Sequence, residues 1–112
     1  MTVSEMARKL ELASLVEGDG SREVTGGYAG DLLSWVMGRA RGGDAWITVM
    51  GNINAVAVAV LADTACIILA EDAPLDEDAR VRAENEQVPI FKSDKTSYRL
   101  AVEIDRLLTG KA

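Results

Sequence analysis

The chain has 112 residues and a formal net charge of −6, with 48% hydrophobic and only 4% aromatic residues. This length predicts one domain, over residues 1–112, and a core of Val, Ala, Leu and Ile is typical of helices packed on a parallel sheet. The negative charge argues against nucleic acid and membrane surfaces as partners. One cysteine and no histidine exclude an intramolecular disulfide and the usual zinc sites.

The first elements in chain order are a helix and a strand. Thr2 and Glu5 have the spacing of a capping box, which predicts a helix from about Ser4 to Leu10. A strand is expected over Leu12 to Val16. The glycines and aspartate at 18–20 then form a turn into a second strand, so the two strands are expected to form a hairpin or to be neighbours.

The stretch from Arg22 to Trp35 is the part around which we expect the chain to be organised. A short strand over Arg22 to Thr25, a glycine turn and a helix capped by Asp31 would follow one another. The glycines of the turn are Gly26, Gly27 and Gly30. Such a turn leaves backbone N–H groups unpaired at a helix N-terminus, which is a common way to build a small binding site. A tight turn with a capped helix is the simpler interpretation.

A βαβ unit is predicted after the next glycine pair. Ala45 to Met50 indicates a buried strand, Asn54 to Leu61 a crossover helix, and Ala65 to Ala70 a second buried strand. The alternating Ala-Val pattern of the crossover also fits a strand. A helix is preferred because two parallel strands need a crossover between them, and Asn52 or Asn54 can cap it.

The last third of the chain predicts a helix, a strand and a helix. The acidic helix begins after Pro74, and the helix dipole explains its first-turn carboxylates without a metal. Pro89 opens a short strand over Ile90 to Lys92, and Ser93 or Asp94 is expected to cap the last helix. That helix carries an apolar stripe of Leu100, Ala101, Ile104, Leu107 and Leu108. The predicted fold is α/β, a single-domain layered sandwich with a mainly parallel sheet.

The residues offer little for catalysis. The P-loop and the dinucleotide fingerprint are absent, and Cys66 lies in an apolar run where a buried, inert thiol is expected. No enzymatic activity, cofactor or metal is therefore predicted. Small polar residues instead follow the predicted strands, where ligands bind in open α/β sheets, although each also fits a cap or a turn. The candidate ligand-binding residues are Thr25, Gly26, Gly27, Asp31, Asn52, Asn54, Ser93 and Thr96.

The sequence also resembles the DRTGG domain family over nearly its whole length. The matching residues are Arg22, Thr25-Gly26-Gly27, Tyr28, Gly30-Asp31-Leu32-Leu33-Ser34, Gly43-Asp44, Trp46-Ile47-Thr48, Asn54 to Ala59 and Val88-Pro89-Ile90. Ser21 stands where the family name predicts an aspartate. The family is related to the N-terminal domain of HPr kinase/phosphorylase, and similar modules occur before phosphotransacetylase domains and beside CBS domains. The resemblance implies a fold like that N-terminal domain and a regulatory, ligand-sensing role, without kinase activity.

Two functions are consistent with these observations. The first is a stand-alone regulatory module that binds a small metabolite or nucleotide and transmits its occupancy to a partner enzyme. The alternative is a structural protein–protein interaction module without a ligand. A cytoplasmic protein is expected, because the longest apolar run, Ala55 to Ala62, is too short to span a bilayer and no leader is recognised. Since the crossover helix is apolar on every side, with Val56, Val58 and Val60 partly exposed, a homodimer is predicted.

Overall fold

Five helices and five strands make up residues 1–110, which the computed structural model describes. The helices are α1 (Val3–Lys9), α2 (Leu33–Arg39), α3 (Ile53–Ala62), α4 (Glu77–Glu86) and α5 (Ser97–Thr109). The strands are β1 (Ala13–Val16), β2 (Gly26–Ala29), β3 (Asp44–Thr48), β4 (Cys66–Leu69) and β5 (Ile90–Lys92). No helix among the described residues is long and apolar enough to cross a membrane.

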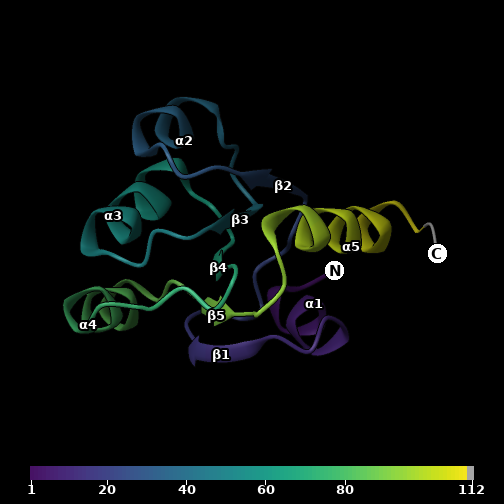
Figure 1. Cartoon of the computed structure of the whole chain (residues 1–112), viewed down its shortest axis with the longest axis horizontal. Helices are drawn as coiled ribbons and strands as arrows, with labels where there is room; N and C mark the ends of the chain where they lie inside the picture. The colour runs from purple at the N-terminus through teal and green to yellow at the C-terminus, as the bar shows by residue number, and fades with distance from the viewer. Residues whose placement is uncertain (111–112) are drawn as a thin grey trace.

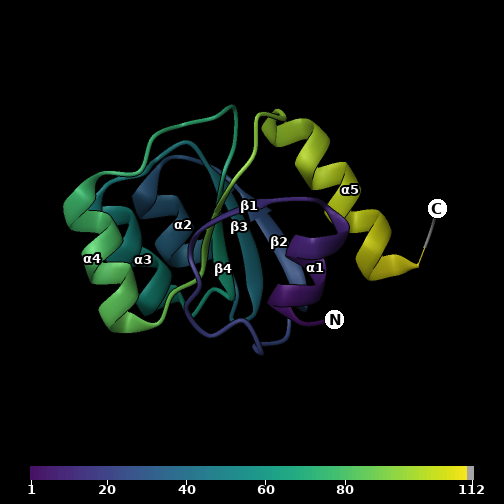
Figure 2. The ribbon, with the colours of Figure 1, turned by 90° about the horizontal axis from the view of Figure 1, so that it is seen from below.

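One five-stranded sheet, in the order β1-β5-β4-β3-β2, separates two layers of helices (Figures 1 and 2). β2, β3, β4 and β5 are parallel, and β1 pairs antiparallel with β5. Both views place α2, α3 and α4 on one face of the sheet and α1 and α5 on the other. The predicted α/β architecture with a mainly parallel sheet is confirmed.

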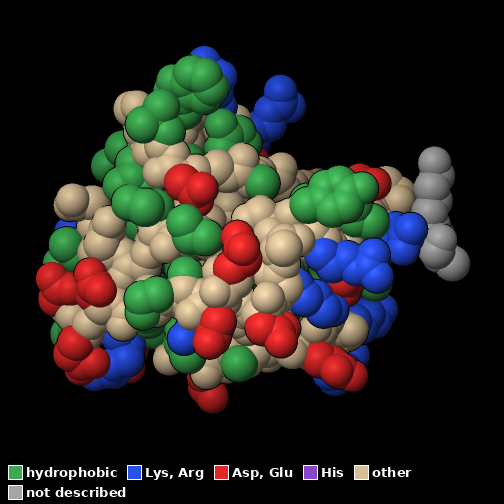
Figure 3. Space-filling view, in the orientation of Figure 1, with side chains coloured by type: hydrophobic (Ala, Val, Ile, Leu, Met, Phe, Trp, Pro, Cys, Tyr) green, Lys and Arg blue, Asp and Glu red, His purple; other side chains and the backbone are tan. Residues whose placement is uncertain are grey.

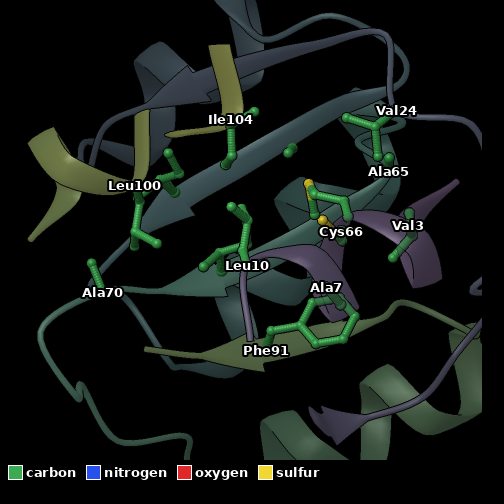
Figure 4. Close-up of a cluster of buried hydrophobic side chains, with 14 residues drawn as sticks. Val3, Ala7, Leu10, Val24, Ala65, Cys66, Ala70, Phe91, Leu100 and Ile104 are labelled. Atoms are coloured by element: carbon green, nitrogen blue, oxygen red, sulfur yellow. The ribbon is translucent and has the colours of Figure 1, made fainter. Parts of the chain in front are cut away.

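Each face of the sheet buries its own hydrophobic cluster, as expected of a sheet covered on both sides. Figure 4 shows the cluster under α1 and α5, which includes Cys66 at the start of β4. Cys66 is fully buried, as predicted, and this burial raises the pKa of its thiol to about 12. The cluster under α2, α3 and α4 surrounds Trp46, whose indole Nε1–H donates to the Gly30 carbonyl oxygen at 2.9 Å.

Two predicted helix starts are confirmed by their caps. Thr2 and Glu5 form the capping box: the Glu5 N–H donates to Thr2 Oγ1 at 3.1 Å, and the Thr2 N–H donates to Glu5 Oε1 at 3.2 Å. This hydrogen bonding lowers the pKa of Glu5. Asn52 caps α3 by accepting from the Ala55 N–H at 2.9 Å. The apolar crossover is therefore a helix.

The glycine turn was predicted wrongly. Gly26 and Gly27 lie in the extended strand β2, and the left-handed glycines in this half of the chain are Gly18 and Gly43. Arg22 to Thr25 is not a strand, because its backbone pairs with the start of the chain through the isolated bridge between Thr2 and Glu23. The predicted hairpin is also wrong, since β1 and β2 form opposite edges of the sheet.

Two predicted caps are wrong as well. Asp31 does not cap α2, because its Oδ1 accepts from Thr48 Oγ1 at 2.7 Å and from the Val49 N–H at 2.9 Å, at the end of β3. The last helix is capped by Thr96 rather than by Ser93 or Asp94, as the Arg99 N–H donates to Thr96 Oγ1 at 3.2 Å. In both cases the neighbouring strand or loop supplies a partner that sequence spacing does not reveal.

Candidate functional site

Five of the predicted site residues follow the carboxyl ends of parallel strands, as expected. Asp31 follows β2, Asn52 and Asn54 follow β3, and Ser93 and Thr96 follow β5. The side-chain oxygens of four of them already accept from backbone N–H groups, with Ser93 Oγ taking that of Lys95 at 3.1 Å. Asn54 is exposed at the start of α3. For most of this set, the structure assigns local roles in caps and loops.

The other three predicted residues, Thr25, Gly26 and Gly27, lie at the opposite, amino-terminal end of β2. Thr25 precedes the strand, and its hydroxyl donates to the Gly42 carbonyl oxygen at 3.4 Å. The eight predicted residues are therefore not brought together at one edge of the sheet. Two grooves, however, run beside β2, and both are lined by Thr25, Gly26 and Gly27.

The first groove lies between β2 and α5 and has a volume of about 480 Å³. Its apolar lining includes Ile47, Ile104 and Leu108, and Asp105 also contributes. A Cβ added to Gly27 would lie 3.9 Å from Ile104 Cγ2, so a side chain at this position would occupy part of the groove. Glycine within a strand often marks a place where a ligand or another backbone approaches closely.

The second groove, of about 470 Å³, lies on the α2 side of β2 and is lined by Arg39, Arg41 and Asp44. Asp44 is buried, and its Oδ2 accepts from the Arg41 N–H at 2.8 Å. A Cβ on Gly26 would come within 2.7 Å of Asp44 Oδ1, so only glycine fits here without a shift of that carboxylate. Gly27 therefore faces the first groove, and Gly26 faces the second.

The two arginines of this groove are available to a ligand. Neither Arg39 nor Arg41 forms an ion pair with a carboxylate anywhere in residues 1–110. The Arg39 guanidinium instead stacks on the Trp35 ring, 3.7 Å from its centroid. Guanidinium groups without a carboxylate partner have the chemistry to bind an anion, even in a protein of net charge −6.

β2 is an edge strand, so one side of its backbone has no neighbouring strand. Within the described part of the chain, no three His, Cys, Asp or Glu residues are placed to hold a metal ion. The sequence interpretation did not include Tyr28, Arg39, Arg41 or Ile104 in the site. The one available signal was that Arg39 and Arg41 are a close basic pair in an acidic chain.

Comparison with known proteins supports the fold. No protein-family model matches the chain, and no relative was found among curated proteins. Among solved structures, the chain is similar to the CBS and DRTGG domains of the regulatory region of a Clostridium perfringens pyrophosphatase, solved with its activator diadenosine tetraphosphate. The TM-score is 0.71 at 9% identity, and the match covers 92% of this chain and 45% of that one. The chain thus spans about half of that region, and the likeness supports a DRTGG-like fold.

Proposed function

We propose that this chain is a regulatory module that binds a small metabolite or nucleotide in the grooves beside β2 without catalysing a reaction. The observation that carries the proposal is the meeting of two grooves at Gly26 and Gly27, one apolar and one lined by the unpaired Arg39 and Arg41. The structural neighbour supports it, because that regulatory region binds a nucleotide activator.

A ligand with an anionic group and a flat apolar group fits this surface best. Guanidinium groups bind phosphate or carboxylate oxygens with paired, charge-assisted hydrogen bonds, which suits Arg39 and Arg41. The groove beside Ile104 and Leu108 offers apolar contacts to a ring. Nucleotides and acyl-CoA compounds combine both groups. In this proposal residues 1–112 are a DRTGG family domain that acts on a partner enzyme in the cytoplasm.

A thermal-shift screen with nucleotides, acyl-CoA compounds and central metabolites tests the proposal. A ligand present at about 100 times its dissociation constant stabilises the fold by about 2.7 kcal/mol, which is a readily measured shift in Tm. For any compound that binds, Arg39→Ala and Arg41→Ala are expected to weaken binding by about tenfold each, since a hydrogen bond to a charged group contributes about 1.5–3 kcal/mol. Arg82→Ala removes an exposed, unpaired arginine of α4 and serves as the control.

Two outcomes would count against the proposal. Failure of every anionic compound to shift Tm would favour the second candidate, a protein–protein interaction module. Equal binding by wild type and both arginine variants would place the ligand elsewhere on the chain. The specific observation that favours the second candidate is the exposed hydrophobic surface of α2 and α3, which includes Trp35 and Leu61.

A further inference from the structure

The outer surface of α2, α3 and α4, named the helical face below, exposes several large hydrophobic side chains. α3 packs between the other two helices. Hydrophobic side chains gather over α2 and α3 in Figure 3. The exposed hydrophobic residues of these two helices and the residue before α2 are Leu32, Trp35, Met37, Val60 and Leu61. Leu61 is 70% exposed and Trp35 52% exposed, and contiguous exposed apolar patches often mark interaction surfaces.

Of the three α3 valines predicted to be partly exposed, only Val60 is exposed in the structure. Val56 and Val58 are buried within the chain, because α2 and α4 flank α3 and close over its sides. Val60 is exposed as predicted, and Leu61 beside it is the most exposed hydrophobic residue of the helix. The apolar surface that needs a partner is therefore smaller than predicted and lies near the carboxyl end of α3.

Charge is distributed unevenly across the helical face. At the α2 side lie Arg39 and, just after the helix, Arg41, which both also line the groove beside β2, and there is no acidic residue between Leu32 and Gly43. α3 has no charged residue at all. The α4 side has five acidic and two basic residues between Asp76 and Gln87, and one of those basic residues, Arg80, is already paired with Glu77 and Glu84. The face thus runs from cationic through apolar to anionic.

We propose that the helical face binds the same face of a second copy of this chain, about a two-fold axis that runs along α3. Rotation about such an axis exchanges the two sides of the face, so that α2 of each copy lies over α4 of the other. The cationic side then meets the anionic side twice, and the exposed Leu61 side chains meet near the axis. An axis across the helices would instead set α2 on α2 and bring four arginines together, which like-charge repulsion disfavours.

The helix directions define which charges approach each other. α2, α3 and α4 each follow a parallel strand in the same sheet, so their carboxyl ends lie at the same edge of it. Arg39, Leu61 and Glu86 all lie in the last turns of their helices. With the axis along α3, Arg39 of one copy therefore approaches Glu86 of the other. Glu86 forms no ion pair within residues 1–110, so it is available to that arginine.

The two proposals share α2. Arg39 lines the groove beside β2, and its guanidinium stacks on Trp35, which belongs to the helical face. A ligand that binds Arg39 in the groove would move its guanidinium off the Trp35 ring. It would also remove the positive charge that faces Glu86 of the second copy. This coupling rests on the proposed function, whereas the self-association does not and is tested without a ligand.

Light scattering coupled to size exclusion, on the ligand-free protein at micromolar concentration, tests the association. The expected mass is twice the 12.0 kDa of the chain. Leu61→Glu is expected to give the single-chain mass, because it places a carboxylate at the axis. Tyr98→Glu is the matched control: Tyr98 is 78% exposed on α5, on the other side of the sheet, and this variant is expected to stay dimeric. A monomeric wild type, or a dimeric Leu61→Glu variant, would overturn the proposal.

Charge reversal tests the arrangement of the two copies. Arg39→Glu and Glu86→Arg are each expected to weaken the dimer by about tenfold or more, because like charges then face one another. The double variant restores the opposite pairing and is expected to recover most of the wild-type affinity, with circular dichroism confirming the fold of each variant. No recovery would overturn the axis along α3. A ligand that still shifts Tm of a monomeric wild type would leave the proposed function standing while this inference fails.

Discussion

Gly18 is expected to tolerate substitution poorly, because both its backbone conformation and its surroundings disfavour a side chain. Its φ is +53°, in the left-handed region that disfavours any side chain. A Cβ there would lie 2.5 Å from Pro89 N, 2.6 Å from Val88 C and 2.7 Å from Gln87 O, all backbone atoms. These atoms cannot move aside freely, because the Asp19 N–H donates to the Gln87 carbonyl oxygen at 3.0 Å and ties the two segments together.

The expected cost of Gly18→Ala follows from two effects. A left-handed conformation costs about 1–2 kcal/mol for a residue with a side chain, and forcing extra atoms into a packed site costs typically about 1–3 kcal/mol. The free energy of unfolding should therefore fall by about 2–5 kcal/mol. At roughly 4 °C per kcal/mol for a domain of this size, Tm should fall by about 8–20 °C.

Gly27→Ala is the matched comparison for Gly18→Ala. Gly27 has no positive φ, and its added Cβ would make ordinary contacts, 3.6 Å from Ala45 O and 3.9 Å from Ile104 Cγ2. This variant should be neutral or more stable by up to about 1 kcal/mol, since alanine restricts the unfolded chain. Urea unfolding followed by circular dichroism measures both. A Gly18→Ala variant as stable as wild type, or a Gly27→Ala variant as unstable as Gly18→Ala, would refute the reasoning.

Three further predictions concern single side chains. Asp31→Ala should lower the free energy of unfolding by about 1–3 kcal/mol, because it leaves the buried Thr48 hydroxyl without its acceptor. Asp31→Asn keeps an acceptor oxygen and should lower the free energy of unfolding less. Denaturant titration of both variants measures the difference. Cys66, with its pKa raised to about 12 by burial, should not react with a thiol reagent at mildly alkaline pH until urea unfolds the chain; reaction at the rate of a free thiol would contradict its burial. The pKa of Glu5 lies below its ordinary value of 4.5, so its stabilising effect is present above that pH and disappears as pH falls through the folded-state pKa. Wild type should therefore be more stable than Glu5→Gln at neutral pH, and the difference should vanish in acid; a difference independent of pH would contradict this.

The order of the elements could be predicted from the sequence because their signals are local. A capping box at Thr2 and Glu5, and the apolar stripe of the last helix, involve neighbours within a few residues. The apolar crossover needed one topological argument, that parallel strands require a connection between them, and α3 confirmed it. These patterns were enough for the α/β class and for most element bounds.

The site could be predicted only in part, because its geometry depends on partners distant in sequence. The glycine pair was recognised, but β2 is extended since it pairs with β3, and a glycine is needed at Gly26 because Asp44 lies beside it. Asp31 likewise finds Thr48 at the end of the next strand instead of capping a helix. Strand order decides these contacts.

The sequence by itself therefore determined the α/β class, most of the elements and the burial of Cys66, all of which follow from composition and short-range periodicity. Only the tertiary structure decided that β2 is an edge strand with α5 on one side and Arg39 and Arg41 on the other. The physical reason is that a groove forms between elements brought together by packing, and packing depends on the pairing of strands far apart in the chain.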